Sequence, residues 1–65
     1  MGKVLTAKQI KKLPPGTDIR VVNNESGDYG LVWIIKNGRK KMLKGIATVH
    51  EIIDRDGWHY ELEED

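Results

Sequence analysis

The spacing of apolar positions near the start of the chain predicts one short helix. Thr6 and Gln9 have the spacing of a capping box, in which each side-chain oxygen accepts a hydrogen bond from the other residue's backbone N–H. Apolar residues recur around them at helical intervals. These residues are Leu5, Ile10 and Leu13. We expect a helix at about 7–13. It ends before two consecutive prolines, because a proline disfavours helical geometry at the residue that precedes it.

Five later segments have the pattern of β-strands. The first alternates apolar and polar residues, as a strand with one buried face does, and the second is a nearly continuous run of β-branched and aromatic residues. A stretch rich in Asn, Ser, Asp and Gly separates these two and is expected to be a loop. The expected strands span about 17–23, 29–36, 39–44, 47–55 and 58–63.

Two dipeptides predict tight hairpins. Asn37-Gly38 follows the second expected strand, and Asp56-Gly57 follows the fourth. Asn-Gly and Asp-Gly favour two-residue type I′ turns, because both central residues of such a turn need positive φ. We therefore expect the second strand to pair with the third, and the fourth with the fifth.

One helix and five strands in 65 residues indicate a mainly β fold in a single domain, residues 1–65. The number and length of the strands resemble a small five-stranded antiparallel barrel of the SH3-like or OB-like kind, with one short N-terminal helix. A chain of this length buries only about 60% of the surface that it exposes when unfolded. It has no Cys, so neither disulfides nor a thiolate zinc site can stabilise it.

The second strand is apolar on both faces, although only one face can point into a small barrel. The turn at 37–38 places Trp33 opposite Met42. If Ile34 and Leu43 face inward, then Trp33 and Met42 lie outside between lysines. The opposite assignment buries Trp33. In a third possibility, Trp33 lies outside the barrel but the apolar residues of the helix pack over it. The pattern leaves this choice open.

The second hairpin has a clearer division of faces. Its expected core side carries Val49, Ile53, Trp58, Tyr60 and Leu62. The other side carries Ile52 among acidic residues, with His59 opposite Asp54 and His50 opposite Glu63. The two imidazoles would then start about 13 Å apart, which is too far for one metal ion.

Charge divides the chain into a basic part and an acidic part. Residues 1–44 contain ten Lys and Arg against three Asp and Glu, whereas residues 45–65 contain one Arg against seven Asp and Glu. Five cations fall in the ten residues from 36 to 45. Such asymmetry is typical of a nucleic-acid-binding face, unless folding brings the two parts together and their charges cancel.

An aromatic residue between cations is how proteins commonly hold single-stranded nucleic acid, with bases stacked on the ring and cations along the phosphates. We therefore expect a small non-enzymatic binding module with salt-sensitive nucleic-acid binding through the hairpin 36–44, single strands favoured. Lys8, Lys11 and Lys12 can extend the basic surface. The candidate nucleic-acid-binding residues are Trp33, Lys36, Arg39, Lys40, Lys41, Met42 and Lys44.

Other uses of the same residues remain open. The chain can be a protein-interaction module, such as a small regulator or inhibitor of bacterial or phage origin, that uses the second strand and the 23–30 loop. Its candidate contact residues are Tyr29, Leu31 and Trp33. A homodimer can bury the surplus apolar face, or the lysines can be a solvated rim without a ligand.

Catalytic and membrane functions find no support in the sequence. There is no Cys nucleophile, Ser26 lacks the context of a nucleophile elbow, and the glycines fall at turns rather than in a phosphate-binding pattern. We assign no catalytic, cofactor-binding or metal-binding residue and expect no cofactor. No apolar run approaches the roughly 20 residues that span a bilayer, so a cytoplasmic protein without a membrane partner is expected.

Overall fold

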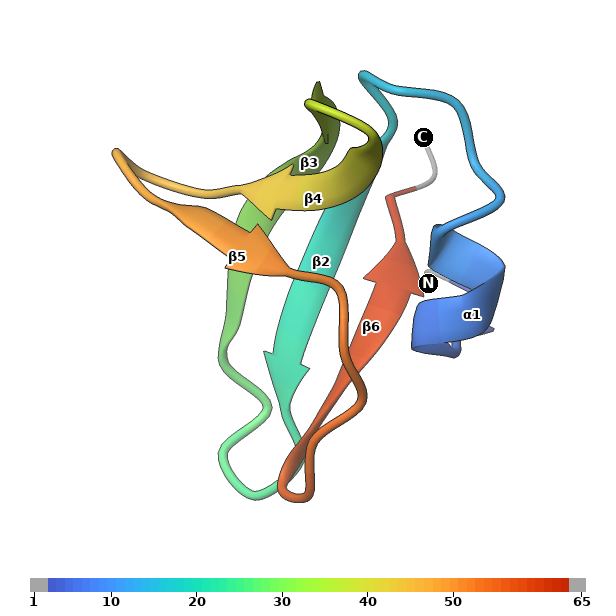
Figure 1. Ribbon diagram of the computed structural model, residues 1–65. Coiled ribbons are helices and arrows are strands. Elements are labelled where there is room, and N and C mark those ends of the chain that lie inside the picture. The colour runs from blue at the N-terminus through green and yellow to red at the C-terminus, as the bar shows by residue number, and fades with distance from the viewer. Residues whose placement is uncertain (1–2, 64–65) are drawn as a thin grey trace.

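The computed structural model describes residues 3–63, which form an antiparallel sheet of six strands with one short helix. The elements are β1 (Val4–Leu5), α1 (Ala7–Ile10), β2 (Asp18–Asn23), β3 (Tyr29–Asn37), β4 (Lys40–Lys44), β5 (Val49–Glu51) and β6 (Trp58–Leu62). The strand order in the sheet is β1-β6-β2-β3-β4-β5. Figure 1 shows β4 and β5 running across the direction of β2 and β6, so the bent sheet wraps around its own concave face. Within the described residues, no helix is long and apolar enough to cross a membrane.

The helix begins with the predicted capping box. The Gln9 backbone N–H donates to Thr6 Oγ1 at 3.3 Å, and the Thr6 N–H donates to Gln9 Oε1 at 2.8 Å. The helix is shorter than expected and ends at Ile10, followed by a turn. Its Ala7 N–H, one of the donors that a helix start leaves unpaired, donates to Asp54 Oδ1 at 3.0 Å. This bond ties α1 to the segment between β5 and β6.

The sheet is not closed into a barrel, which corrects the expected architecture. A sixth strand, β1, pairs with β6 through Val4 and Leu5, and it forms one edge of the sheet. The other edge is β5, which is only three residues long instead of the expected nine. Segment 52–57 continues from β5 without pairing to another strand among the described residues, so nothing joins the two edges.

The β3–β4 hairpin forms, but its turn lies one residue further along the chain than expected. Asn37 pairs with Lys40, which leaves Gly38 and Arg39 as the two turn residues. Gly38 has φ 63° and Arg39 has no positive φ, a pattern that fits a type II′ turn rather than type I′. Trp33 therefore lies opposite Lys44 instead of Met42. Each β3 residue pairs with a β4 residue two positions further along the chain than expected. Because side chains alternate with a period of two, every side chain keeps its expected face.

The second expected hairpin is wrong. A turn does form at Asp56-Gly57, but the strands beside it pair elsewhere. β5 pairs with β4, whereas β6 pairs with β1 on one side and with β2 on the other. His59 consequently lies opposite Val22 rather than Asp54, and His50 lies opposite Leu43 rather than Glu63. β6 gains five residue pairs along β2, which outweigh the local pairing that the turn alone would favour.

The core lies on the concave face of the sheet, beneath α1. Its buried residues are Leu5, Ala7, Ile10, Ile19, Ile34, Leu43, Ile52 and Tyr60. Of the core side expected for the second hairpin, Tyr60 is buried and Trp58 and Leu62 pack against the core. Val49 is 44% exposed, and Ile52, which was expected near solvent, is fully buried. The expected alternation fails here because the chain leaves the sheet after Glu51.

Ile34 and Ile35 test which face of β3 points inward. Ile34→Ala should destabilise the fold by about 2–5 kcal/mol, because it leaves a cavity in the core. Ile35→Ala, on the outer face, should cost no more than about 1 kcal/mol, the range of β-propensity effects. Urea unfolding of the two variants provides the comparison. Equal losses, or a larger loss for Ile35→Ala, would reverse the assignment of faces.

Tyr60 should make the fold sensitive to alkaline pH. Burial raises the pKa of its phenol, whose O–H donates to the Ile53 carbonyl at 2.8 Å. A raised folded-state pKa means that this contribution is complete below the ordinary Tyr pKa of about 10 and is lost as pH rises through the folded value. At pH 7, Tyr60→Phe should cost about 1 kcal/mol.

Denaturant unfolding at pH 7 and above pH 10 measures this effect. The difference between the parent protein and Tyr60→Phe should shrink at the higher pH. Tyr29→Phe, at an exposed position, is the matched control and should change stability by less than about 0.5 kcal/mol at pH 7. An unchanged gap between parent and Tyr60→Phe across this range would contradict the role given to the buried phenol.

Candidate functional site

The structure settles which face of β3 is inside and places Trp33 on the outer face of the sheet. Ile34 and Leu43 are buried and opposite each other, whereas Trp33 is 38% exposed. Trp33 is flanked by Lys44 on β4 and by Asp18 on β2. Pairing on both sides holds the Trp33 backbone in the middle of the sheet, so the indole is presented from a rigid support.

The seven residues predicted for nucleic-acid binding separate into groups. The outer face holds Trp33, Lys40, Met42 and Lys44. Lys36 and Lys41 lie opposite each other on the inner face, and Arg39 is in the turn.

Lys41 has a structural role that the sequence pattern did not reveal. Its ammonium group donates to the Leu13 carbonyl at 2.6 Å, a bond between residues 28 positions apart. That carbonyl follows α1 and lies next to Pro14. Lys41 thereby brings the hairpin next to the chain that leaves the helix.

Cations from the hairpin and the helix meet at one hollow. It has a volume of about 490 Å³, and its cationic lining residues are Lys11, Arg39, Lys40 and Lys41. Glu51 is the single carboxylate among its lining residues. Lys11 therefore extends the basic surface, and the hollow offers several donors to an anionic group.

The three residues predicted for protein binding lie in one row along the outer face of β3. Tyr29, Leu31 and Trp33 alternate with inward positions and are 57%, 55% and 38% exposed. Val49 on β5 lies beyond Lys44 and is also exposed. Tyr29, Leu31 and Trp33 form an apolar strip, and Lys44 borders it beside Trp33.

An ion pair occupies the other border of this strip. Arg20 Nε and Nη2 donate to the two carboxylate oxygens of Glu63 at 2.9 and 3.2 Å. The hydrogen bond from Arg20 holds the pKa of Glu63 below its usual value. The guanidinium carbon of Arg20 also lies 4.9 Å from the centre of the Tyr29 ring. Arg20 is therefore already engaged, whereas Lys40 and Lys44 supply the open positive charge of the outer face.

The two histidines do not form a metal site together. His59 Nε2 lies 2.6 Å from Glu61 Oε2, and its Nδ1 contacts the Asn24 side-chain oxygen. His50 Nε2 lies 2.8 Å from the Thr48 hydroxyl. In residues 3–63, no three His, Cys, Asp or Glu side chains gather in a way that could hold a metal ion.

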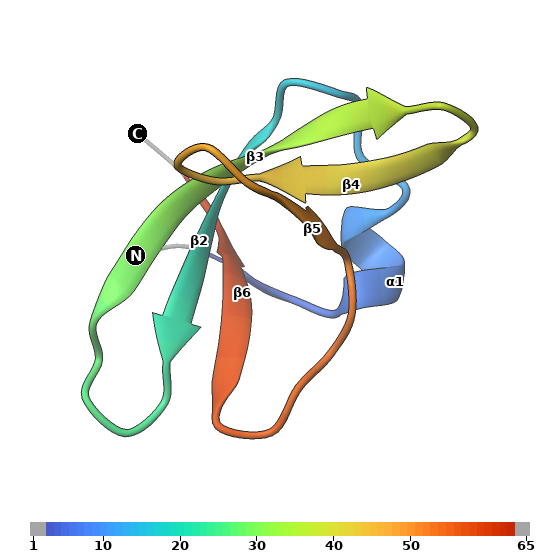
Figure 2. The same cartoon turned by 60° about the vertical axis from the view of Figure 1, so that its left-hand side comes forward.

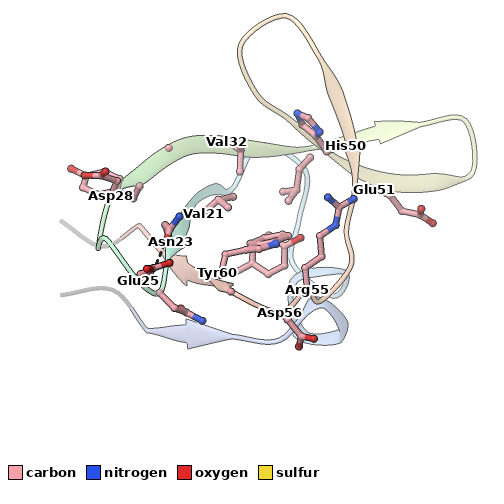
Figure 3. A pocket seen from close by; sticks show the side chains of 16 residues that line it. Val21, Asn23, Glu25, Asp28, Val32, His50, Glu51, Arg55, Asp56 and Tyr60 are labelled. Atoms are coloured by element: carbon pink, nitrogen blue, oxygen red, sulfur yellow. Dashed lines mark hydrogen bonds between the residues drawn. The ribbon is translucent and has the colours of Figure 1, made fainter.

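A larger hollow on the inner face was missed by the sequence analysis. It has a volume of about 960 Å³ and lies between the β2–β3 loop and the 52–57 segment, as Figure 3 shows. The hollow exists because the second expected hairpin does not form. The sequence pattern predicted that hairpin, so it gave no indication of a hollow at this position. The one available signal was Gly30, an inward position of β3 without a side chain.

Comparison of the chain with protein-family models, with curated proteins and with solved structures finds no match in any of the three. The geometry of the described residues is therefore the basis for assigning a function.

Trp33 should behave as an accessible fluorophore. In a Trp58→Phe background it is the one indole of the chain, and its partial exposure predicts red-shifted emission that iodide quenches, helped by the nearby Lys44. In the reciprocal Trp33→Phe variant, the half-buried Trp58 should emit further to the blue and be quenched less. Blue-shifted, iodide-resistant emission from Trp33 would show that this face is covered in solution.

Proposed function

We propose that this chain is a non-enzymatic binding module that binds nucleic acid, single strands in preference, through the outer face of the β3–β4 hairpin. The observation that carries the proposal is the exposed indole of Trp33 with Lys44 directly opposite it and Lys40 further along the same face. Aromatic rings among cations on a rigid sheet suit bases that stack and phosphates that need countercharge.

The fold is consistent with such a module, and we propose that it is an opened SH3-like barrel. β2 to β5 follow one another as a meander, and β6 returns to lie beside β2. Figure 2 shows β4 and β5 folded back towards α1. The bend exposes the convex face of β3 and β4 while the concave face packs into the core.

The chemistry of this face predicts weak binding without base selectivity. A base stacked on Trp33 contributes about 1–3 kcal/mol, and Lys40 and Lys44 start about 13 Å apart along β4. The basic hollow beside the hairpin turn can hold a further phosphate. Asp18 next to Trp33, and Glu51 next to Met42, reduce the local positive potential. The proposed ligand is therefore held by a few phosphate contacts and released by salt.

Titration of the Trp58→Phe protein with an oligothymidine and with a duplex, at about 50 and 200 mM salt, tests the proposal. The oligothymidine should quench Trp33 at low salt and bind more tightly than the duplex. Lys44→Gln should lower the slope of log affinity against log salt by about 0.7, the value for one phosphate contact on a single strand.

Lys36→Gln is the matched control, because it removes the same charge from the same hairpin but from the inner face. Its salt slope should equal that of the parent. If Lys36→Gln lowers the slope as much as Lys44→Gln, the hairpin acts as an undirected positive charge and the outer face is not the site. No quenching by either oligonucleotide at low salt would reject nucleic-acid binding.

A second candidate function is protein binding by the row of Tyr29, Leu31 and Trp33. The observation that favours it is the continuity of this exposed apolar row, since an apolar patch on a small protein commonly marks an interface. An accessible Trp33 that no oligonucleotide quenches in the titration above would favour this function over the first.

A further inference from the structure

The larger hollow has an apolar floor on the inner face of the sheet. It lies towards the opposite end of β3 from the turn at 38–39, apart from the proposed nucleic-acid face (Figure 3). The apolar floor is formed by Val21, Val32, Leu43, Trp58 and Tyr60. Trp58 and Tyr60 meet edge to face, with ring centres 4.6 Å apart.

The hollow stays open because neither a side chain at Gly30 nor the 52–57 segment fills it. Gly30 faces inward opposite Val21, and a Cβ placed on it would meet no atom within 4 Å. Segment 52–57 leaves the sheet and therefore does not cover the floor. Val21, Val32 and Trp58 remain half-buried as a result, although they pack against the core on their other side.

The rim of the hollow is acidic. Its lining includes three carboxylates of the two loops against one cation, Arg55. The carboxylates belong to Glu25, Asp28 and Asp56, whereas Glu51, which also lines the hollow, directs its carboxylate away from it (Figure 3). The ion pairs found in residues 3–63 are Arg20 with Glu63 and His59 with Glu61, so none of the three is engaged in one. An apolar floor beneath a negative rim is complementary to a ligand with an apolar stem and a positive head.

The rim is held in place before any ligand binds. The Asn23 side-chain oxygen accepts hydrogen bonds from the Glu25 and Ser26 N–H groups at 2.9 and 3.2 Å, which fixes the β2–β3 loop. The Asn24 N–H donates to the Gly57 carbonyl at 3.0 Å and joins this loop to the turn before β6. Fixed loops lose little conformational entropy on binding, which favours recognition.

We propose that this hollow binds a basic segment of a protein partner by taking up one of its Arg or Lys side chains. The aliphatic stem lies along Val21, Val32 and Trp58, and the charged head reaches the carboxylates of the rim. The indole of Trp58 adds a cation–π contact. The volume exceeds that of one side chain, so flanking residues of the segment enter as well.

The same features exclude other occupants. The negative rim repels the phosphates of a nucleic acid, and a neutral ligand would gain no electrostatic attraction from the carboxylates. The inference does not depend on nucleic-acid binding, because the two surfaces use different faces and opposite charges. Either can fail in experiment without affecting the other.

The first experiment is an NMR titration of the ¹⁵N-labelled protein with an acetylated, amidated Gly-Gly-Arg-Gly-Gly peptide. The control peptide carries citrulline in place of arginine, which preserves the shape and removes the charge. The arginine peptide should shift the Trp58 indole N–H and the Gly30 and Gly57 amides, with smaller shifts at higher salt. The citrulline peptide should leave these signals unmoved.

Two variants locate the binding. Gly30→Val places a side chain in the hollow at a position without positive φ, so it should abolish the peptide-induced shifts while the melting temperature stays the same or rises. The triple variant Glu25→Gln, Asp28→Asn, Asp56→Asn should bind about fivefold more weakly, because the single guanidinium of the peptide loses its exposed carboxylate partners. Asp18→Asn, which removes a carboxylate from the outer face, should bind like the parent.

Three results would overturn the inference. Equal shifts with the citrulline peptide would show that charge plays no part. Shifts that persist in a folded Gly30→Val protein would place the peptide elsewhere. Shifts of the same signals that grow with protein concentration alone would assign the hollow to a second copy of this chain.

Discussion

The pairing of β6 with β2 is the contact on which the rest of the fold depends. It joins residues about forty positions apart, from Ile19 with Leu62 to Asn23 with Trp58, and so must overcome the entropy of closing a long loop. In return it places Tyr60 in the core and aligns Arg20 with Glu63. β6 also provides the edge to which β1 attaches, since the Leu62 N–H donates to the Lys3 carbonyl at 2.8 Å. Without β6 in the middle of the sheet, β1 and α1 would have no strand to pack against.

Local signals explain the elements that were predicted, and long-range competition explains the errors. The capping box at Thr6 and the hairpin between β3 and β4 depend on residues close in sequence, and both form. Asp56-Gly57 also forms its turn, yet the flanking strand pairs with β2, where Tyr60 becomes part of the core. The two-residue strand β1 has no pattern of its own and exists only where β6 offers an edge. The shift of the first turn to Gly38 and Arg39 has a local cause. More than one turn type accepts a glycine there, so the dipeptide alone does not fix the turn position.

The candidate site was predictable in its composition but not in its arrangement. Alternation placed Trp33 and Ile34 on opposite faces, and only the packing of Ile34 in the core beneath α1 decided which side is buried. Lys41 had the same sequence context as its neighbours, but it lies on the inner face and its ammonium group donates to the Leu13 carbonyl. Gly30 alone did not predict the acidic hollow, because the hollow also depends on how the chain crosses from β5 to β6.

The length of β3 determines how a partner meets the charges of this molecule. Nine residues of strand extend over about 30 Å, which separates the cations at the β3–β4 turn from the carboxylates of the β2–β3 loop by more than the roughly 8 Å over which physiological salt screens charge. An approaching molecule therefore meets a positive end and a negative end separately, even though the formal net charge is only +1. A cationic partner is attracted to the loop end and repelled at the turn end, and an anionic partner is affected in the opposite way. The distribution of charge along β3 thus determines the orientation in which a partner first makes contact.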